Sequence, residues 1–324
     1  MKRKIFALTA LVLSLVLMLG ACAAGEIKST AEQARVVGMC GEHEIRYEEL
    51  RYLTMNYKME LEAKYGEEIF ADRETGAQYE NELRELVSDA LAESYALVEL
   101  CEREGVLLSD KTSKKQVKEY VKESIDLCGG KEAYREYLEQ NYLTDWVFRL
   151  NTAILGCQQR YYEILAEKND KQAYDAVMSG EGMIRCRSIF VKNDPGENVS
   201  ANRKAAQAVC DEIKNGGKTV EDFIGKKVNQ DTSNCDYYFM KGYFLEEYEE
   251  AAFALEIGEV SDVVAVSDGF YVIQRVAPEE GYFESHVEEL MVQYHISTME
   301  QETQTIANRL SVEWKEDIEL WSMQ

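Results

Sequence analysis

The sequence predicts an α+β protein in which a strand-containing segment lies between two helical stretches. Three observations lead to this class. Apolar residues recur at helical spacing through residues 45–177. Residues 183–192 alternate as strands do and carry branched and aromatic side chains, and residues 269–276 form a further expected strand that Pro278 closes. Helical spacing then returns through residues 283–310. We therefore expect helices first, a small mixed domain second and a final helix third.

Composition sets the broad class of protein. The chain has 324 residues, 46% of them hydrophobic and 30% charged, which is typical of a globular protein. At roughly 150 residues per domain, this length predicts about two domains. The chain has 36 Lys and Arg residues and 60 Asp and Glu residues, which gives a formal net charge of −24. Because affinity for a phosphate backbone depends on clustered basic residues, we expect no nucleic-acid binding.

The N-terminus has the pattern of a secretory signal peptide. A basic start at residues 2–4 is followed by the apolar run Ile5–Leu19, which is shorter than the roughly 20 residues needed to span a bilayer. The next residues, Leu19-Gly20-Ala21-Cys22, resemble the bacterial lipobox, in which the cysteine is acylated after cleavage. We therefore expect a signal peptide over 1–21, a lipid anchor on Cys22 and a flexible tether over 22–35. This arrangement would place the protein on the extracytoplasmic face of a bacterial membrane.

The cysteines and histidines indicate neither a metal site nor a cofactor. Acylation of Cys22 would leave seven other cysteines, an odd number, so that at least one thiol stays unpaired. The spacings contain no Cys-x-x-Cys, and the chain has three histidines. We interpret most of the cysteines as small core residues. They lie at positions 40, 101, 128, 157, 186, 210 and 235.

The first helical stretch, residues 36–180, is expected to form one domain. Val36–Gly41 reads as a short strand or extended segment that leads into it. Helix breaks are expected at Gly105 and at Gly129-Gly130, since glycine commonly ends a helix. The many tyrosines in this stretch allow two interpretations: they line a cradle for client proteins, or they form the half-exposed rims of helix packing.

The following segment contains strands and short helices in about 95 residues. Thr219-Val220-Glu221-Asp222 has the pattern of a capping box that opens a short helix. We expect strands and longer helices at Met183–Lys192 (strand), Ala201–Lys214 (helix), Glu246–Leu255 (helix), Ile257–Val260 (edge strand) and Gly269–Val276 (strand).

Three stretches of this segment resemble the parvulin-type peptidyl-prolyl isomerases. Ile184–Val191 resembles the first strand of that family, Glu249–Ser261 the stretch after its proline pocket, and Asp268–Ile273 its last strand. Val37–Leu50 resembles the start of the SurA-type chaperone domain. With the lipobox in front, the whole chain resembles a PrsA-type foldase lipoprotein.

This resemblance implies an architecture. A mostly helical SurA-like chaperone domain at 36–180 would hold an inserted parvulin-like domain at 181–279. The inserted domain would have a small antiparallel sheet covered by helices. Residues 280–324 would then form a C-terminal helix that packs on the N-terminal domain.

The resemblance also implies catalytic positions, and this chain departs from the family at two of them. Ser188 and Tyr271 stand where the family has a hydrogen-bonded histidine pair, and Asp231 stands at the position of the family's Cys or Asp. Ser188 and Tyr271 can hydrogen-bond to each other and to the substrate, as the histidines would, without carrying charge. The alternatives are that Ser188 and Tyr271 simply fill a strand interior and that Asp231 is a turn residue.

The family's substrate pocket is altered but stays aromatic. Phe244 stands at a Met position and Tyr248 at a Phe position, with Phe253 nearby and Cys186 on the first strand. The resemblance implies that these four residues bind substrate, whereas ordinary core packing is the alternative for the three aromatic residues.

Two functions are compatible with this site. Rotation about an X-Pro bond breaks no covalent bond, so an isomerase needs no general acid or base. The chain is therefore either an isomerase acting on proline-containing exported polypeptides or a holdase that binds unfolded ones on the same fold. A third class, the substrate-binding lipoproteins of transporters, would need alternating strands and helices through most of the chain, which residues 45–177 lack.

Overall fold

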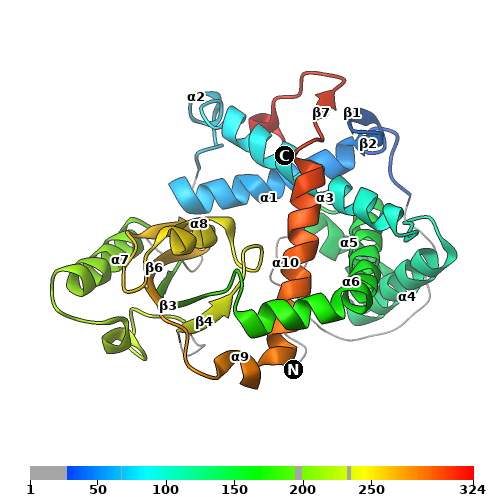
Figure 1. Ribbon diagram of the computed structural model, residues 1–324. Coiled ribbons are helices and arrows are strands. Elements are labelled where there is room, and N and C mark those ends of the chain that lie inside the picture. Colours follow the sequence, from blue (N-terminus) through cyan, green and yellow to red (C-terminus); the bar gives the residue numbers. More distant parts are fainter. Residues whose placement is uncertain (1–27, 67, 194–198, 232–234) are drawn as a thin grey trace. The chain divides into compact units, whose positions relative to one another are not determined.

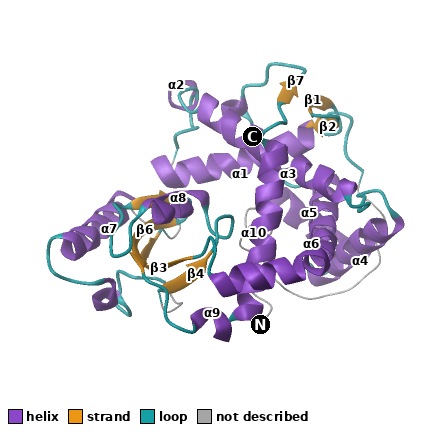
Figure 2. Cartoon of the chain, viewed as in Figure 1, coloured by secondary structure: helices purple, strands orange, loops and turns teal. Residues whose placement is uncertain are grey.

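The computed structural model describes residues 28–66, 68–193, 199–231 and 235–324 (Figure 1). The expected signal peptide, the lipid-anchor residue Cys22 and most of the expected tether lie outside these ranges. Within them, no helix is both long enough and apolar enough to cross a membrane. The α+β class is confirmed: helices dominate and the strands form two small antiparallel sheets (Figure 2).

The chain divides into two compact units, which are described separately. One contains Ala166–Glu300, and the other contains Glu68–Leu165 and Gln301–Gln324 together with the described residues up to Met59. The expected domain boundaries at 36–180, 181–279 and 280–324 stay predictions.

The mostly helical unit holds a three-stranded antiparallel sheet in the order β2-β1-β7, formed by β1 (Val36–Cys40), β2 (His43–Arg46) and β7 (Val312–Trp314). The strand expected at Val36–Gly41 is thus confirmed. The helices that follow β2 are α1 (Tyr47–Tyr65), α2 (Arg73–Gly76), α3 (Glu80–Arg103), α4 (Lys111–Leu127), α5 (Lys131–Gln140) and α6 (Asp145–Ser179), and a 3₁₀ turn, η2 (Leu320–Ser322), lies near the C-terminus. The last residues of α1 and α6 belong to the other unit.

Helix ends follow the local sequence. α3 ends just before Gly105, whose φ of +74° suits glycine, and the expected breaks at Gly105 and Gly129-Gly130 are both confirmed. α4 begins after Asp110, whose side chain accepts a hydrogen bond from the backbone N–H of Ser113 at 2.8 Å.

Tyrosines of this unit lie within helix packing. Tyr52 and Tyr134 are buried in one apolar cluster with Phe148 and Val147. The Tyr134 hydroxyl donates to a carboxylate oxygen of Asp145 at 3.1 Å, so its polar end is also satisfied inside the unit. For these two residues the structure supports the packing interpretation.

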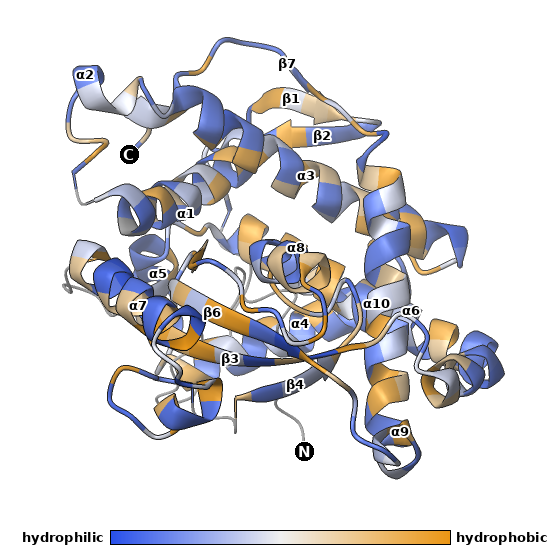
Figure 3. Ribbon diagram, turned by 60° about the vertical axis from the view of Figure 1, so that its left-hand side comes forward, coloured by the Kyte–Doolittle hydropathy of each residue, from blue (hydrophilic) through white to orange (hydrophobic). Residues whose placement is uncertain are grey.

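The second unit holds a four-stranded antiparallel sheet in the order β4-β3-β6-β5. Figure 3 shows hydrophobic stretches along β3 and β6, the two central strands. In chain order the elements are β3 (Ile184–Lys192), α7 (Val199–Lys214), the 3₁₀ turn η1 (Val220–Phe223), β4 (Asp236–Phe239), α8 (Glu246–Ala254), β5 (Val264–Val266) and β6 (Gly269–Val276).

Four of the expected elements are confirmed here, and two expectations need correction. β3, α7, α8 and β6 lie where the sequence places them. β4 is not among the elements expected from the sequence. The edge strand is Val264–Val266, whereas Ile257–Val260 contributes one isolated bridge, from Val260 to Gln274. Ile257 is 64% exposed and lies in a turn, and the residues after it hydrogen-bond to β6 through the backbone.

The C-terminal helices begin in this second unit. They are α9 (Tyr282–Ser285) and α10 (Val287–Ala307). Leu290 near the start of α10 is buried in a cluster with Tyr238 and Met240, the latter just after β4, and with Val177 near the end of α6. Beyond α10, β7 pairs with β1 in the mostly helical unit. The expected packing of all of 280–324 on the N-terminal domain stays a prediction.

Candidate functional site

One face of the four-stranded sheet carries a cluster of aromatic side chains under α8, which we call the aromatic face. Because side chains alternate along a strand, Cys186, Ser188 and Phe190 of β3 point to this face. The other members come from β4, β6, α8 and the segment before α8. The apolar cluster consists of Ile184, Cys186, Tyr237, Phe239, Tyr243, Phe244, Tyr248, Ala251, Ala252, Phe253, Leu255, Val264, Tyr271 and Ile273.

The rings of this face touch mainly edge to face. Phe244 lies 5.1 Å from Tyr248 and 4.7 Å from Phe239, measured between ring centroids. Phe253 lies 5.8 Å from Phe239. Tyr248 is only 2% exposed, so core packing describes it well, whereas Phe244, Phe253 and Tyr271 are half-buried.

The structure corrects one expectation about Ser188 and Tyr271. Among the described residues these two side chains do not hydrogen-bond to each other. Instead the Tyr248 hydroxyl donates to Ser188 Oγ at 3.3 Å. The register explains this, because Ser188 lies opposite Ile273 and Tyr271 lies opposite Phe190, two residues further along the strand. Tyr248 from α8 contacts both, since its ring also meets Tyr271 edge-on at 4.9 Å.

Asp231 joins the aromatic face through a residue that the sequence analysis missed. The Tyr237 hydroxyl donates to Asp231 Oδ2 at 2.5 Å, and the Tyr237 ring meets Phe244 at 5.4 Å. Tyr237 lies opposite Cys186 in the β3–β4 ladder. Its place in the run Asp236-Tyr237-Tyr238-Phe239 was a usable signal, since consecutive aromatic residues favour a strand.

Asn229 is a second residue that sequence reasoning missed. It is 8% exposed, and its Oδ1 accepts from the backbone N–H groups of Phe190 and Asp231, each at 3.1 Å. Its Nδ2 lies 3.1 Å from Cys235 Sγ. Asn229 thus fixes the segment that carries Asp231 to the edge of β3.

The hydroxyl and thiol groups of the aromatic face are uncharged at neutral pH. Burial raises the pKa of Cys186 to about 12 and raises the pKa of Tyr248, and burial together with the nearby Asp268 and Asp231 raises the pKa of Tyr271. These groups can therefore act as neutral hydrogen-bond donors, not as proton-transfer groups near pH 7. A site of this kind can hold an apolar ring and withdraw an amide carbonyl from water.

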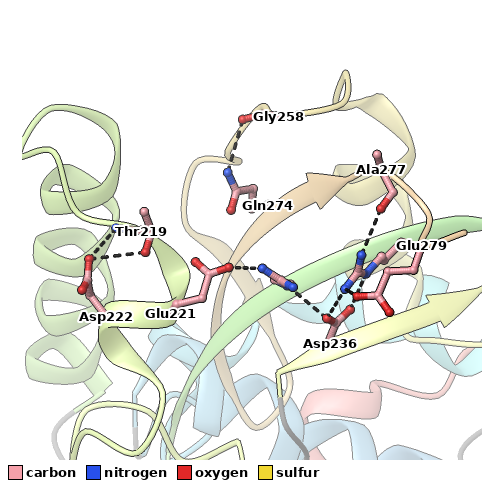
Figure 4. Close-up of polar contacts among 10 residues, drawn as sticks. Thr219, Glu221, Asp222, Asp236, Gly258, Gln274, Ala277 and Glu279 are labelled. Carbon is pink, nitrogen blue, oxygen red and sulfur yellow. Dashed lines mark hydrogen bonds and ion pairs between the residues drawn. The ribbon is translucent and has the colours of Figure 1, made fainter.

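The opposite side of β3 and β4 carries an ion-pair network. Asp236 accepts from Arg185 Nε at 2.8 Å and Nη2 at 2.6 Å and from Arg187 Nε at 3.0 Å. Arg185 also pairs with Glu279, and Arg187 with Glu221 (Figure 4). Partial burial by itself would raise the pKa of Asp236, but the two arginines outweigh it and hold that pKa below its usual value.

The described residues contain no group of three or more His, Cys, Asp and Glu side chains arranged to hold a metal ion. All seven described cysteines are free thiols; Cys128 is half-buried and the other six are buried, which agrees with their interpretation as core residues.

A small antiparallel sheet with α8 over an aromatic face and α7 on the other side forms an α+β domain. No family model matches the chain. Over 180 residues it is 26% identical to the foldase protein PrsA of Staphylococcus aureus, both in strain MRSA252 and in strain Newman. The matched region covers 53% of this chain and 55% of each relative, so the chain spans about half the length of the curated relatives it matches.

Solved structures of PrsA and of a peptidyl-prolyl isomerase are also similar to this chain. PrsA from Bacillus subtilis shares 20% identity at a TM-score of 0.28, covering 71% of this chain and 84% of that one. PrsA from Streptococcus pneumoniae shares 18% at a TM-score of 0.34, covering 72% and 85%. Peptidyl-prolyl isomerase ESS1 from Candida albicans shares 19% at a TM-score of 0.28, covering 37% and 76%. The resemblance to PrsA-type foldases with a parvulin domain is confirmed, and it stands on the sequence match.

Proposed function

We propose that this chain is an extracytoplasmic foldase, anchored through a lipid on Cys22, that binds proline-containing segments of exported polypeptides on its aromatic face and speeds their isomerisation. The observation that carries the proposal is the set of half-buried, uncharged rings around the buried Tyr248. The sequence match to PrsA foldases supports it.

The chemistry of isomerisation suits such a face. The barrier to rotation about an X-Pro amide is about 18–20 kcal/mol, and lowering it requires only that the twisted amide bind better than the planar one. Aromatic rings hold the proline ring and exclude water from the carbonyl, which removes hydrogen bonds that stabilise the planar form. The hydroxyl of the half-buried Tyr271 supplies a neutral donor for the rotated amide.

One observation favours a second function, that of a holdase without catalysis. Ser188 is fully buried and its hydroxyl is already bonded to Tyr248. One of the two positions that stand in place of the family's histidine pair is therefore closed to substrate. In this case the face binds peptide but leaves the isomerisation rate unchanged.

The two functions are separated by NMR exchange spectroscopy on an Ala-Ala-Pro-Phe peptide with the chain from residue 23 onward. We compare wild type, Tyr271→Phe and Asp231→Asn, with Tyr174→Phe as control because Tyr174 is 48% exposed and lies on α6. Exchange faster than the uncatalysed rate, lost in Tyr271→Phe and kept in Tyr174→Phe, supports the isomerase. Changes in the peptide's chemical shifts without faster exchange support the holdase. If the peptide shows neither shift changes nor faster exchange, both functions are contradicted.

The anchor is tested separately by metabolic labelling with a palmitate analogue and membrane fractionation. We expect the wild-type chain to be labelled and to sediment with membranes, and Cys22→Ala to lose the label. Equal labelling of both chains, or no labelling of the wild type, would contradict a lipid on Cys22.

A further inference from the structure

Glu249 is a buried carboxylate that no function described above uses. It lies on α8 directly after Tyr248 and is 5% exposed, while Glu246, Glu247 and Glu250 of the same helix are exposed. A carboxylate is rarely buried unless its oxygens are hydrogen-bonded, because desolvation of the charge is costly.

The partners of Glu249 are three consecutive backbone N–H groups. The N–H of Gly242 donates to Oε2 at 2.7 Å. The N–H groups of Tyr243 and Phe244 donate to Oε1 at 2.6 and 2.7 Å. Gly242 has a φ of +90°, a conformation that turns the chain so that successive N–H groups converge on one point. Such convergent N–H groups bind anions, and here the anion is supplied by the protein itself.

This contact fixes the segment that precedes α8. The segment is also held on its other side, where the Ser297 hydroxyl of α10 donates to the carbonyl oxygen of Lys241. Phe244, the last residue of the three, lies with its ring against Phe239 and Tyr248. The position of the Phe244 ring on the aromatic face is thus tied to the carboxylate of Glu249.

We propose that Glu249 is a positioning residue for ligand binding. Its carboxylate holds Phe244 against Tyr248 and Phe239, so that the aromatic face exists before the ligand arrives. Rigid presentation of an aromatic ring improves affinity, because no ordering of the segment is then needed on binding. The proposal rests on the proposed peptide-binding function of this face.

Two variants remove the hydrogen bonds of the Glu249 carboxylate to different extents. Glu249→Ala removes all three acceptor contacts, whereas Glu249→Gln keeps one carbonyl oxygen and loses the charge. Glu250→Gln is the matched control, since it makes the same change of charge at an exposed neighbour on α8. Each chain, from residue 23 onward, is first checked for cooperative thermal unfolding, and binding is measured well below the unfolding midpoint.

Two readouts are taken on each variant: the Kd for the Ala-Ala-Pro-Phe peptide from an NMR titration, and the signal of Phe244 in chains labelled with fluorophenylalanine. We expect Glu249→Ala to bind about tenfold more weakly, Glu249→Gln to lie between, and Glu250→Gln to stay within about twofold of wild type. The Phe244 signal should shift and broaden in Glu249→Ala while the chain stays folded, which a purely stabilising role would not produce.

The outcomes separate this inference from the proposed function. A wild-type chain that binds no peptide overturns the peptide-binding function. A Phe244 signal or a Kd that is the same in wild type and Glu249→Ala overturns the positioning role. If Glu249→Ala fails to fold, the same two comparisons are made with Glu249→Gln.

Discussion

The two faces of the four-stranded sheet differ sharply, although alternating residues of the same strands supply both. On the aromatic face, half-buried rings surround Tyr248 under α8. On the other face, which we call the closed face, Ile189 and Val272 are fully buried against Val209 of α7 and Val220 of η1. The closed face is apolar and buried where α7 and η1 cover it, whereas several rings of the aromatic face are half-buried. Both faces contribute to the core of this unit, but half-buried rings, on which the proposed peptide binding depends, lie on the aromatic face.

The first prediction compares two isoleucines, one on each face. Ile189 on the closed face and Ile273 on the aromatic face are both fully buried, so changing either to Ala should lower the free energy of unfolding by about 2–5 kcal/mol. Urea unfolding measures this loss. Of the variants that stay folded, only Ile273→Ala should bind the peptide more weakly. Weaker binding by folded Ile189→Ala would contradict the separation of the two faces.

The second prediction concerns the ion-pair network beside the closed face. Asp236→Asn leaves two arginines without their shared carboxylate and should lower the free energy of unfolding by about 1–3 kcal/mol. Thermal or urea unfolding at pH 7 measures it, and peptide affinity should be unchanged. Asp262→Asn is the control. The carboxylate of Asp262, which pairs with Lys214, is 97% exposed, so no measurable loss of stability is expected.

The same network predicts the sign of a pH effect. The pKa of Asp236 in the folded chain is held below its usual value, so its contribution is fully present above about pH 4, the ordinary value for aspartate, and is lost as the pH falls through the folded-state value. The stability difference between wild type and Asp236→Asn should therefore shrink below about pH 4. A constant difference down to pH 3 would show that Asp236 acts through packing.

The third prediction tests the buried hydroxyl pair on the aromatic face. Tyr248→Phe leaves Ser188 Oγ buried without its donor, which should cost about 1 kcal/mol of folding free energy. Because neither hydroxyl is exposed, peptide affinity should change by less than about twofold. A titration showing a loss of tenfold or more would mean that this pair contacts the ligand and that the aromatic face opens more deeply than the structure shows.

The smallest expected effect is that of pH on peptide binding at the aromatic face. Burial raises the pKa of Tyr271 and Tyr248, and that of Cys186 to about 12, so these groups keep their protons through the neutral range. Peptide affinity and any catalysed exchange should therefore change by less than about twofold between pH 6 and pH 9. A transition centred near pH 6.5 would instead indicate that a histidine acts in the site.

Local sequence patterns predicted most elements of the sheet domain and failed at its edges. β3 was predicted from its alternating residues and β6 from its run of branched and aromatic residues before Pro278, and both signals belong to the strand itself. β4 was missed although its three aromatic residues favour a strand, because the run is only four residues long and its pairing with β3 cannot be read from the local sequence. The edge strand was misplaced by a few residues, since an edge pairs on one side alone and its sequence is less constrained.

The sequence by itself determined the α+β class, the helices and central strands, and the aromatic character of Phe244, Tyr248 and Tyr271, because periodicity, turn residues and residue type act within a few positions of the chain. Only the tertiary structure decided that Tyr248, not Tyr271, hydrogen-bonds to Ser188, 60 residues away, that Tyr237 holds Asp231, and that Glu249 binds the segment before α8. These contacts depend on strand register and on how α8 lies over the sheet. Both are set by the packing of the whole unit, which no short stretch of sequence encodes.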